Sequence, residues 1–223
     1  MKNGSLPKVA IGDFGCQYTD LIQQRLRDEV RVRAAIVKLD GLLEYCKKNE
    51  VQAVILSGSG MSVNDKDSPS LPPGLMDYRL ASGRQIPILG ICYGMQRVGY
   101  ELGGEVKRVL ETTHHGDALV FRSDTSPLFF GIRNRQSVRV SHGDSVTVLP
   151  PGFKSVGWFQ SGGIAAMEDP KRGVYCVQFH PEVSHTPYGG KILENFVIDI
   201  AGCSRDWQPA DMIEEIRGQA LEE

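Results

Sequence analysis

Short apolar runs rich in β-branched residues alternate with helix-like segments through the first hundred residues, and this alternation restricts the fold more than any other feature. The runs are typical of buried strands, and the intervening segments place apolar residues at helical spacing. Strands connected through helices form right-handed β-α-β units, so we expect a parallel sheet. The expected strands cover residues 8–15, 30–39, 51–59 and 86–92, and the expected helices cover residues 16–29, 41–50, 74–85 and 93–104.

The second half of the chain changes character. Strand-like runs follow one another with turn signals between them, and a helical pattern returns only over residues 188–202. We therefore expect an α/β fold of flavodoxin-like or Rossmann-like type, with a mostly parallel sheet flanked by helices and a partly antiparallel second half. The strand-like runs cover residues 117–124, 136–150, 153–160, 163–169 and 173–182.

Two segments are expected along the chain: one domain over residues 1–203 and a helical tail or linker over residues 204–223. The tail carries one apolar stripe at helical spacing, which could cap the domain or dock elsewhere. The stripe consists of Met212, Ile213, Ile216, Ala220 and Leu221.

Composition excludes several classes of protein. Of the 223 residues, 41% are hydrophobic and 23% are charged, which is typical of a globular domain. The formal net charge of -2 provides no basic surface for nucleic acid or for an acidic membrane. No apolar run approaches the roughly 18 residues that a spanning helix needs. We expect a cytoplasmic protein with neither a nucleic-acid nor a membrane partner.

The cysteines argue against disulfides and against a metal site. They are odd in number and scattered, without a C-x-x-C pair or zinc-ligand spacing. We expect free thiols in a reducing compartment, at least four of them acting as small buried side chains. The five are Cys16, Cys46, Cys92, Cys176 and Cys203.

One of these cysteines lies in a pattern that suggests chemistry. The sequence GICYG at residues 90–94 follows an expected strand and begins an expected helix, as in the strand-to-helix elbow that presents a nucleophile. The first turn of a helix stabilises a thiolate at Cys92, and the Tyr93 amide can face a developing oxyanion. The pentapeptide alone also fits a buried cysteine in a glycine-rich bend.

A cysteine nucleophile needs a base, and the base needs a group that orients it. His180 and Glu182 stand two residues apart at the end of a strong expected strand, so both side chains project to one side of extended backbone. Pro181 favours that extended geometry at His180. Taken singly, His180 is better explained as a structural histidine at a strand end, and Glu182 as a solvated loop carboxylate. Of the other histidines, His114 and His115 lie in an expected polar turn and His185 in an expected loop, while His142 belongs to the segment VSHGDS. None of these four has a carboxylate two residues later at the end of a strong strand.

Three motifs in order make the pattern specific. LGICYGMQ, SHGDSV and VQFHPEV together resemble the class I, triad-type glutamine amidotransferases, and among them those of GMP synthases. The resemblance covers roughly residues 8–203. It implies hydrolysis of L-glutamine to glutamate and ammonia through a γ-glutamyl thioester, without a metal.

The resemblance also implies a role for each matching residue. Cys92 would be the nucleophile, His180 the general acid/base and Glu182 its orienting partner, with the Tyr93 amide as an oxyanion donor. The glutamine head group would be bound by Gln96, Ser141, Gly143 and Asp144, with Asp144 facing the ammonium group.

One loop departs from the family pattern. The family usually reads SGGP after the third strand, whereas this chain reads SGSGM at residues 57–61. Ser59 therefore stands where a glycine amide completes the oxyanion hole. If that position needs a positive φ, serine is penalised by roughly 1 kcal/mol or more. We hypothesise low glutaminase activity in isolation, raised by a partner that reorients the loop.

The acceptor of the ammonia follows from resemblance alone. GMP synthases also carry an ATP pyrophosphatase domain with an SGGVDS-like phosphate loop, which this sequence lacks. ATP, magnesium and XMP would then belong to a synthetase partner, and the chain would be a separate subunit or an excised domain. Alternatives are an amidotransferase for another acceptor, a γ-glutamyl peptidase-like cysteine hydrolase, and a catalytically quiet regulatory homologue.

Overall fold

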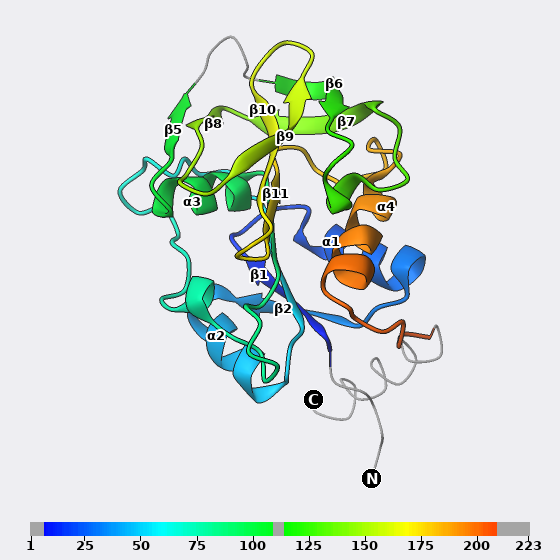
Figure 1. The fold of residues 1–223 in the computed structure, drawn as a ribbon. Coiled ribbons are helices and arrows are strands. Elements are labelled where there is room, and N and C mark those ends of the chain that lie inside the picture. The colour runs from blue at the N-terminus through cyan, green and yellow to red at the C-terminus, as the bar shows by residue number, and fades with distance from the viewer. Residues whose placement is uncertain (1–6, 109–113, 209–223) are drawn as a thin grey trace.

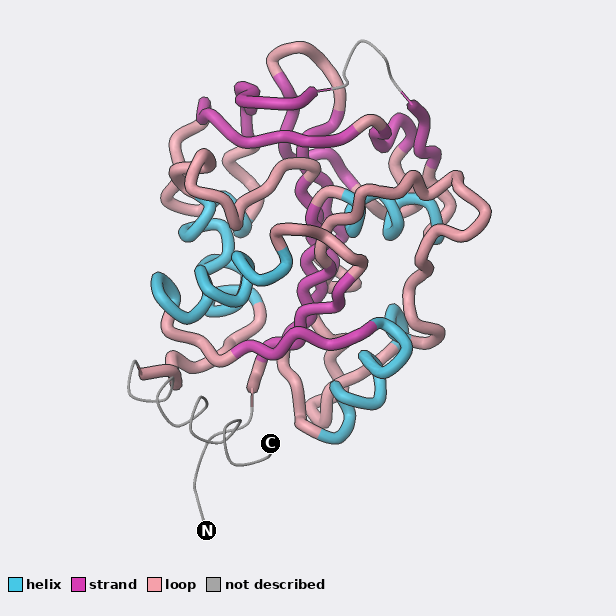
Figure 2. Tube along the Cα trace, turned by 180° about the vertical axis from the view of Figure 1, so that it is seen from behind, coloured by secondary structure: helices cyan, strands magenta, loops and turns pink. Residues whose placement is uncertain are grey.

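The computed structural model describes residues 7–108 and 114–208. Within them nine strands form one twisted sheet in the order β2-β1-β3-β4-β11-β10-β9-β6-β7, and β5 and β8 form a small second sheet (Figure 1). The helices lie on both sides of the strands, as the view from behind shows (Figure 2). This arrangement confirms the expected α/β fold.

The parallel and antiparallel parts of the large sheet meet at β11. From β2 to β11 neighbouring strands run parallel, and from β11 to β7 they run antiparallel. The parallel strands are β1 (Val9–Asp13), β2 (Ala34–Lys38), β3 (Ala53–Leu56), β4 (Ile88–Ile91) and β11 (Val174–Val177). The others are β5 (Glu105–Arg108), β6 (His114–Arg122), β7 (Arg135–His142), β8 (Asp144–Val148), β9 (Lys154–Phe159) and β10 (Ile164–Asp169).

Side chains on the parallel strands alternate between two cores, because successive residues of a strand point to opposite faces. Ile11, Ile55 and Ile91 pack on one face, and Ala10, Val54 and Ile88 pack on the other. The first face is covered by α1 (Thr19–Arg25), η1 (Leu26–Val30), α4 (Gly189–Glu194) and η5 (Asn195–Ile200). The second is covered by α2 (Leu39–Lys48) and α3 (Tyr93–Glu101).

The expected helix over residues 74–85 is wrong. Only a 3-10 turn, η2 (Leu75–Asp77), forms there. Gly74 and Gly83 adopt φ angles of 80° and 82°, which interrupt a right-handed helix at both ends of the segment. The Gly83 amide donates to the Leu80 carbonyl oxygen at 2.8 Å, closing a tight turn instead. The connection from β3 to β4 is therefore mostly loop.

The second half of the chain departs from the sequence pattern at two places. The single run over residues 136–150 divides at Gly143, because β7 pairs with β6 while β8 pairs with β5. The expected polar turn at residues 114–115 is wrong, since β6 begins at His114. A 3-10 turn, η4 (Pro127–Phe129), follows β6.

The expected helix over residues 209–223 lies outside the described residues.

A search for membrane spans over the described residues finds no helix with the length and apolar character to cross a bilayer.

Candidate active site

A sharp backbone turn places Cys92 between β4 and α3. Cys92 adopts φ 53° and ψ -106°, an unusual conformation for a residue with a side chain. A Cβ on Gly90 would lie 2.9 Å from the carbonyl carbon of Gly94, and one on Gly94 would lie 2.6 Å from the carbonyl oxygen of Leu56. Both flanking positions therefore require glycine, as the elbow pattern indicated.

The Cys92 thiol lines a cavity of about 610 Å³, although the residue is only 3% exposed. Its Sγ lies 3.7 Å from the carbonyl oxygen of Ser141 on β7. Tyr93 is the first residue of α3, so its amide N–H has no acceptor within the helix. The sulfur thus faces solvent-accessible space beside a helix N-terminus.

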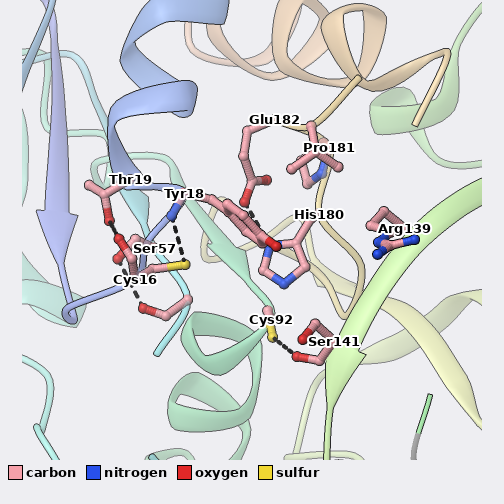
Figure 3. A network of polar contacts seen from close by, with 12 residues as sticks. Cys16, Tyr18, Thr19, Ser57, Cys92, Arg139, Ser141, His180, Pro181 and Glu182 are labelled. Atoms are coloured by element: carbon pink, nitrogen blue, oxygen red, sulfur yellow. Dashed lines mark hydrogen bonds and ion pairs between the residues drawn. The ribbon is translucent and has the colours of Figure 1, made fainter. Parts of the chain in front are cut away.

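His180 and Glu182 form the contact that their spacing predicted. His180 Nδ1 lies 2.6 Å from Glu182 Oε1, and both residues are buried. Figure 3 shows the imidazole between Cys92 and Glu182. The backbone is fixed as well: the His180 amide donates to the Arg139 carbonyl oxygen at 2.9 Å, and the Thr186 hydroxyl donates to the His180 carbonyl oxygen at 2.7 Å.

The surroundings of His180 favour its charged form. Burial alone lowers the pKa of His180, but hydrogen bonds with Cys92 and Glu182, and the negative charges of these groups, raise it to about 11. A positively charged imidazole therefore stands next to the thiol at neutral pH. This pairing is the electrostatic setting in which a thiolate is stabilised.

Two residues that sequence reasoning missed complete the surroundings of His180. The ring of Tyr18 contacts the imidazole edge-on at a centroid distance of 5.2 Å. A Cβ on Gly58 would lie 3.1 Å from the Sγ of Cys16 and 3.3 Å from Cε1 of His180, so the three residues are close neighbours. Cys16 and Tyr18 also line the cavity. No motif identified them, because they follow β1, far from His180 in sequence.

The four residues expected to bind the glutamine head group all line this cavity: Gln96, Ser141, Gly143 and Asp144. Gln96 Nε2 donates to the Asp144 carbonyl oxygen at 2.7 Å, so α3 supports the segment between β7 and β8. The Ser62 hydroxyl donates to the Asp144 carboxylate from the opposite loop. His142 is a buried residue of β7 whose Nδ1 lies 3.0 Å from the Asp144 carbonyl oxygen.

Ser59 also lines the cavity, on the loop that follows β3. Its φ is not positive, so serine carries no left-handed strain in this conformation. The Met61 amide donates to the Ser59 Oγ at 3.3 Å, a contact that a glycine would lack. The penalty expected for serine therefore concerns a reoriented loop and not the conformation seen here.

Arg25 of α1 holds the segment that follows the histidine, another role that no motif predicted. Its Nη1 donates to the carbonyl oxygens of Pro181, Val183 and Thr186. A Cβ on Gly189 would lie 1.8 Å from the Pro181 oxygen, so α4 must begin with glycine to approach this segment. Arg25 thereby fixes the backbone on both sides of Glu182.

All five cysteines are free thiols, as the sequence predicted. Cys46, Cys176 and Cys203 are buried away from the cavity, and burial raises the pKa of each to about 12. Cys16 is half-buried rather than buried, and burial raises the pKa of its thiol too. The part of the chain that the structure describes contains no group of three or more potential metal ligands.

The fold and the elbow cysteine correspond to a known family. Residues 10–200 match the class-I glutamine amidotransferases, and the chain belongs to that family. Within it, the chain is similar to glutamine-hydrolyzing GMP synthases. It is 45% identical over 214 residues to that of Thermus thermophilus and 42% identical over 222 residues to that of Nitrobacter hamburgensis.

These alignments cover 96% and 95% of this chain but 41% and 39% of the two relatives. The chain thus spans about two fifths of their length. Among solved structures, a candidate GMP synthase subunit from Thermoplasma acidophilum has a TM-score of 0.74 at 26% identity and covers 96% of this chain and 98% of its own. A glutamine amidotransferase from Thermotoga maritima has the same fold, with a TM-score of 0.69 at 17% identity, covering 88% of this chain and 98% of its own.

Proposed function

We propose that this chain hydrolyses L-glutamine to glutamate and ammonia, using Cys92 as nucleophile, His180 as general acid/base and Glu182 as the group that orients the imidazole. The observation that supports this most directly is the 2.6 Å contact between His180 and Glu182, beside a thiol held at a strained elbow in the same cavity. These three parts correspond to nucleophile, base and orienting group.

In the first half of the proposed reaction, Cys92 and His180 react as a thiolate–imidazolium pair, with the cysteine proton already on the imidazole, and the sulfur attacks the side-chain carbonyl carbon of glutamine. The carbonyl oxygen becomes an oxyanion facing the Tyr93 amide. The C–N bond then breaks as His180 returns the proton to the departing nitrogen, leaving ammonia and a γ-glutamyl thioester. Removing one oxyanion donor from such a site typically costs about 100- to 1,000-fold in rate.

In the second half, water replaces ammonia. His180 takes a proton from the water as its oxygen attacks the thioester carbon, and the C–S bond breaks to release glutamate and restore Cys92. Glu182 keeps Nδ1 of the imidazole occupied throughout, so that Nε2 remains available for the moving proton. The residues of this chain suffice for these steps without a cofactor.

We further propose that the ammonia serves a synthetase that aminates XMP to GMP in an ATP- and magnesium-dependent reaction. Support comes from the curated relatives, which are named GMP synthases. The chains of these relatives extend well beyond the part that matches this chain. An acceptor of a different kind would leave the glutaminase site unchanged, so the acceptor needs its own test.

The decisive experiment measures glutamate release by the wild type and by Cys92→Ala, together with labelling by a glutamine-mimicking electrophile. We expect turnover and labelling in the wild type and neither in the variant. Release that persists in Cys92→Ala would refute the mechanism, and faster cleavage of γ-glutamyl peptides than of glutamine would favour a peptidase. Adding a separate ATP pyrophosphatase partner with XMP then tests for GMP formation.

A further inference from the structure

One strong cation on the cavity wall belongs to neither the triad nor the expected glutamine-binding residues. Arg108, the last residue of β5, is exposed and lines the cavity that contains Cys92 and Asp144. Among the described lining residues it is the only arginine or lysine. A permanent positive charge at this position needs an explanation that the hydrolysis steps do not supply.

The strand pairing places this cation beside an anion. β5 and β8 are antiparallel, and Arg108 is the cross-strand partner of Asp144. Directly opposed residues project to the same face, with their Cβ atoms about 4.5–5.5 Å apart. Among the described residues no ion pair joins these two side chains, and the Asp144 carboxylate instead accepts a hydrogen bond from the Ser62 hydroxyl. The two charges therefore stand next to each other on one wall.

The alternation along β5 also turns Arg108 toward the cavity. Val106, two residues earlier and on the same face, is 6% exposed and belongs to the core beneath α3. Lys107 points to the other side, where its Nζ lies 2.5 Å from Glu105 Oε2. Lys107 is thus already paired with Glu105 on the outer side of β5. Within the described residues no hydrogen bond or ion pair involves the Arg108 side chain.

We propose that Arg108 binds the α-carboxylate of free L-glutamine, next to Asp144, to which the family resemblance assigns the α-ammonium. This rests on the proposed glutaminase function and assigns Arg108 as a substrate-binding residue. A guanidinium offers two parallel N–H donors to a carboxylate, and the adjacent aspartate accepts from the ammonium. The pair would select free glutamine over a glutamine residue within a peptide, which has neither charge.

Two truncated substrates separate the two charges. 4-Aminobutanamide is glutamine without the α-carboxylate, and 5-amino-5-oxopentanoate is glutamine without the α-ammonium. We expect Arg108→Met to lower kcat/KM for glutamine by about 10-fold or more, mainly through KM, and to change that for 4-aminobutanamide by less than about 2-fold. Asp144→Asn should spare 5-amino-5-oxopentanoate instead. Ammonia release is the readout.

The controls keep the outcome unambiguous. Lys107→Met removes a cation from the same strand on its outer side and should behave as wild type, and Arg108→Lys should recover part of the glutamine affinity. Equal losses for glutamine and 4-aminobutanamide in Arg108→Met, or no loss for either, would overturn the assignment.

A binding measurement tests the pair without turnover. In Cys92→Ala, calorimetry should detect glutamine binding that Arg108→Met weakens by about 10-fold or more. If that binding were lost as expected while the wild type released no glutamate, the proposed function would fail and the head-group assignment would stand. Unchanged binding would reject the assignment alone.

Discussion

Arg25 Nη1 donates a hydrogen bond to the carbonyl oxygen of Val183 at 3.0 Å, linking the first helix to the segment just after Glu182. The two residues are 158 positions apart in sequence. This contact helps to orient the imidazole indirectly. Glu182 can hold His180 in place only if the backbone of Glu182 is itself fixed.

Replacing Arg25 should therefore reduce catalysis more than substrate binding. We expect Arg25→Ala to lower kcat by about 10- to 100-fold with little change in KM, since a small displacement of catalytic groups is costly. Arg25→Lys should be intermediate. Arg135→Ala, which removes a surface arginine at the start of β7, is the matched control. A fall in thermal stability with unchanged kcat would contradict the positioning role.

The contacts that keep His180 positively charged should make the free energy of unfolding depend on pH. The pKa of His180 is raised from its ordinary 6.5 to about 11, so the native state holds this proton longer than the unfolded chain does. The resulting stabilisation is complete below pH 6.5, declines as the pH rises above it, and is gone above about 11.

Glu182→Gln removes one charge that raises this pKa, so the decline should become shallower. Urea unfolding of the wild type and the variant between pH 6 and 9 measures the difference in slope, and His185→Asn, at an exposed histidine, is the control. Identical slopes in wild type and Glu182→Gln would show that His180 is not held in its charged form.

Glycine at position 94 should be indispensable for a geometric reason. A Cβ there would lie 2.6 Å from the Leu56 carbonyl oxygen and could not be relieved by rotating a side chain. We expect Gly94→Ala to destabilise the protein by about 1–3 kcal/mol or more and to abolish activity. In contrast, Gly41→Ala should stabilise the protein by up to about 1 kcal/mol, because Gly41 lies within α2 with no atom within 4 Å of the new Cβ. Thermal unfolding distinguishes the two.

Ser59 should limit the activity of the isolated chain. We expect Ser59→Gly to raise glutamate release without a partner, because glycine removes the contact with the Met61 amide and permits the loop to reorient its own amide. Addition of the synthetase partner should bring the two proteins closer together in turnover. High and equal turnover by both proteins, with or without the partner, would show that this loop does not control the site.

Local patterns predicted what depends on local physics. The alternation of strands and helices indicated the parallel sheet, and the glycines around Cys92 indicated the elbow. Apolar spacing predicts a helix over residues 74–85, but the positive φ angles of Gly74 and Gly83 prevent one, and spacing alone does not reveal them. Arg25, Cys16 and Arg108 were missed because each acquires its neighbours only through the topology of the sheet.

The position of β11 has a consequence for the order in which the molecule can be assembled. This strand, the last one within the described residues, inserts between β4 and β10, so the edge of β4, directly before Cys92, has no neighbour on that side until residues 174–177 have been synthesised. A nascent chain of 170 residues would contain Cys92, but the edge of β4 would be unpaired. Unpaired strand edges promote aggregation. The strand that closes this gap ends only three residues before His180, so we expect a chain truncated before residue 180 to lack both a closed sheet and all glutaminase activity.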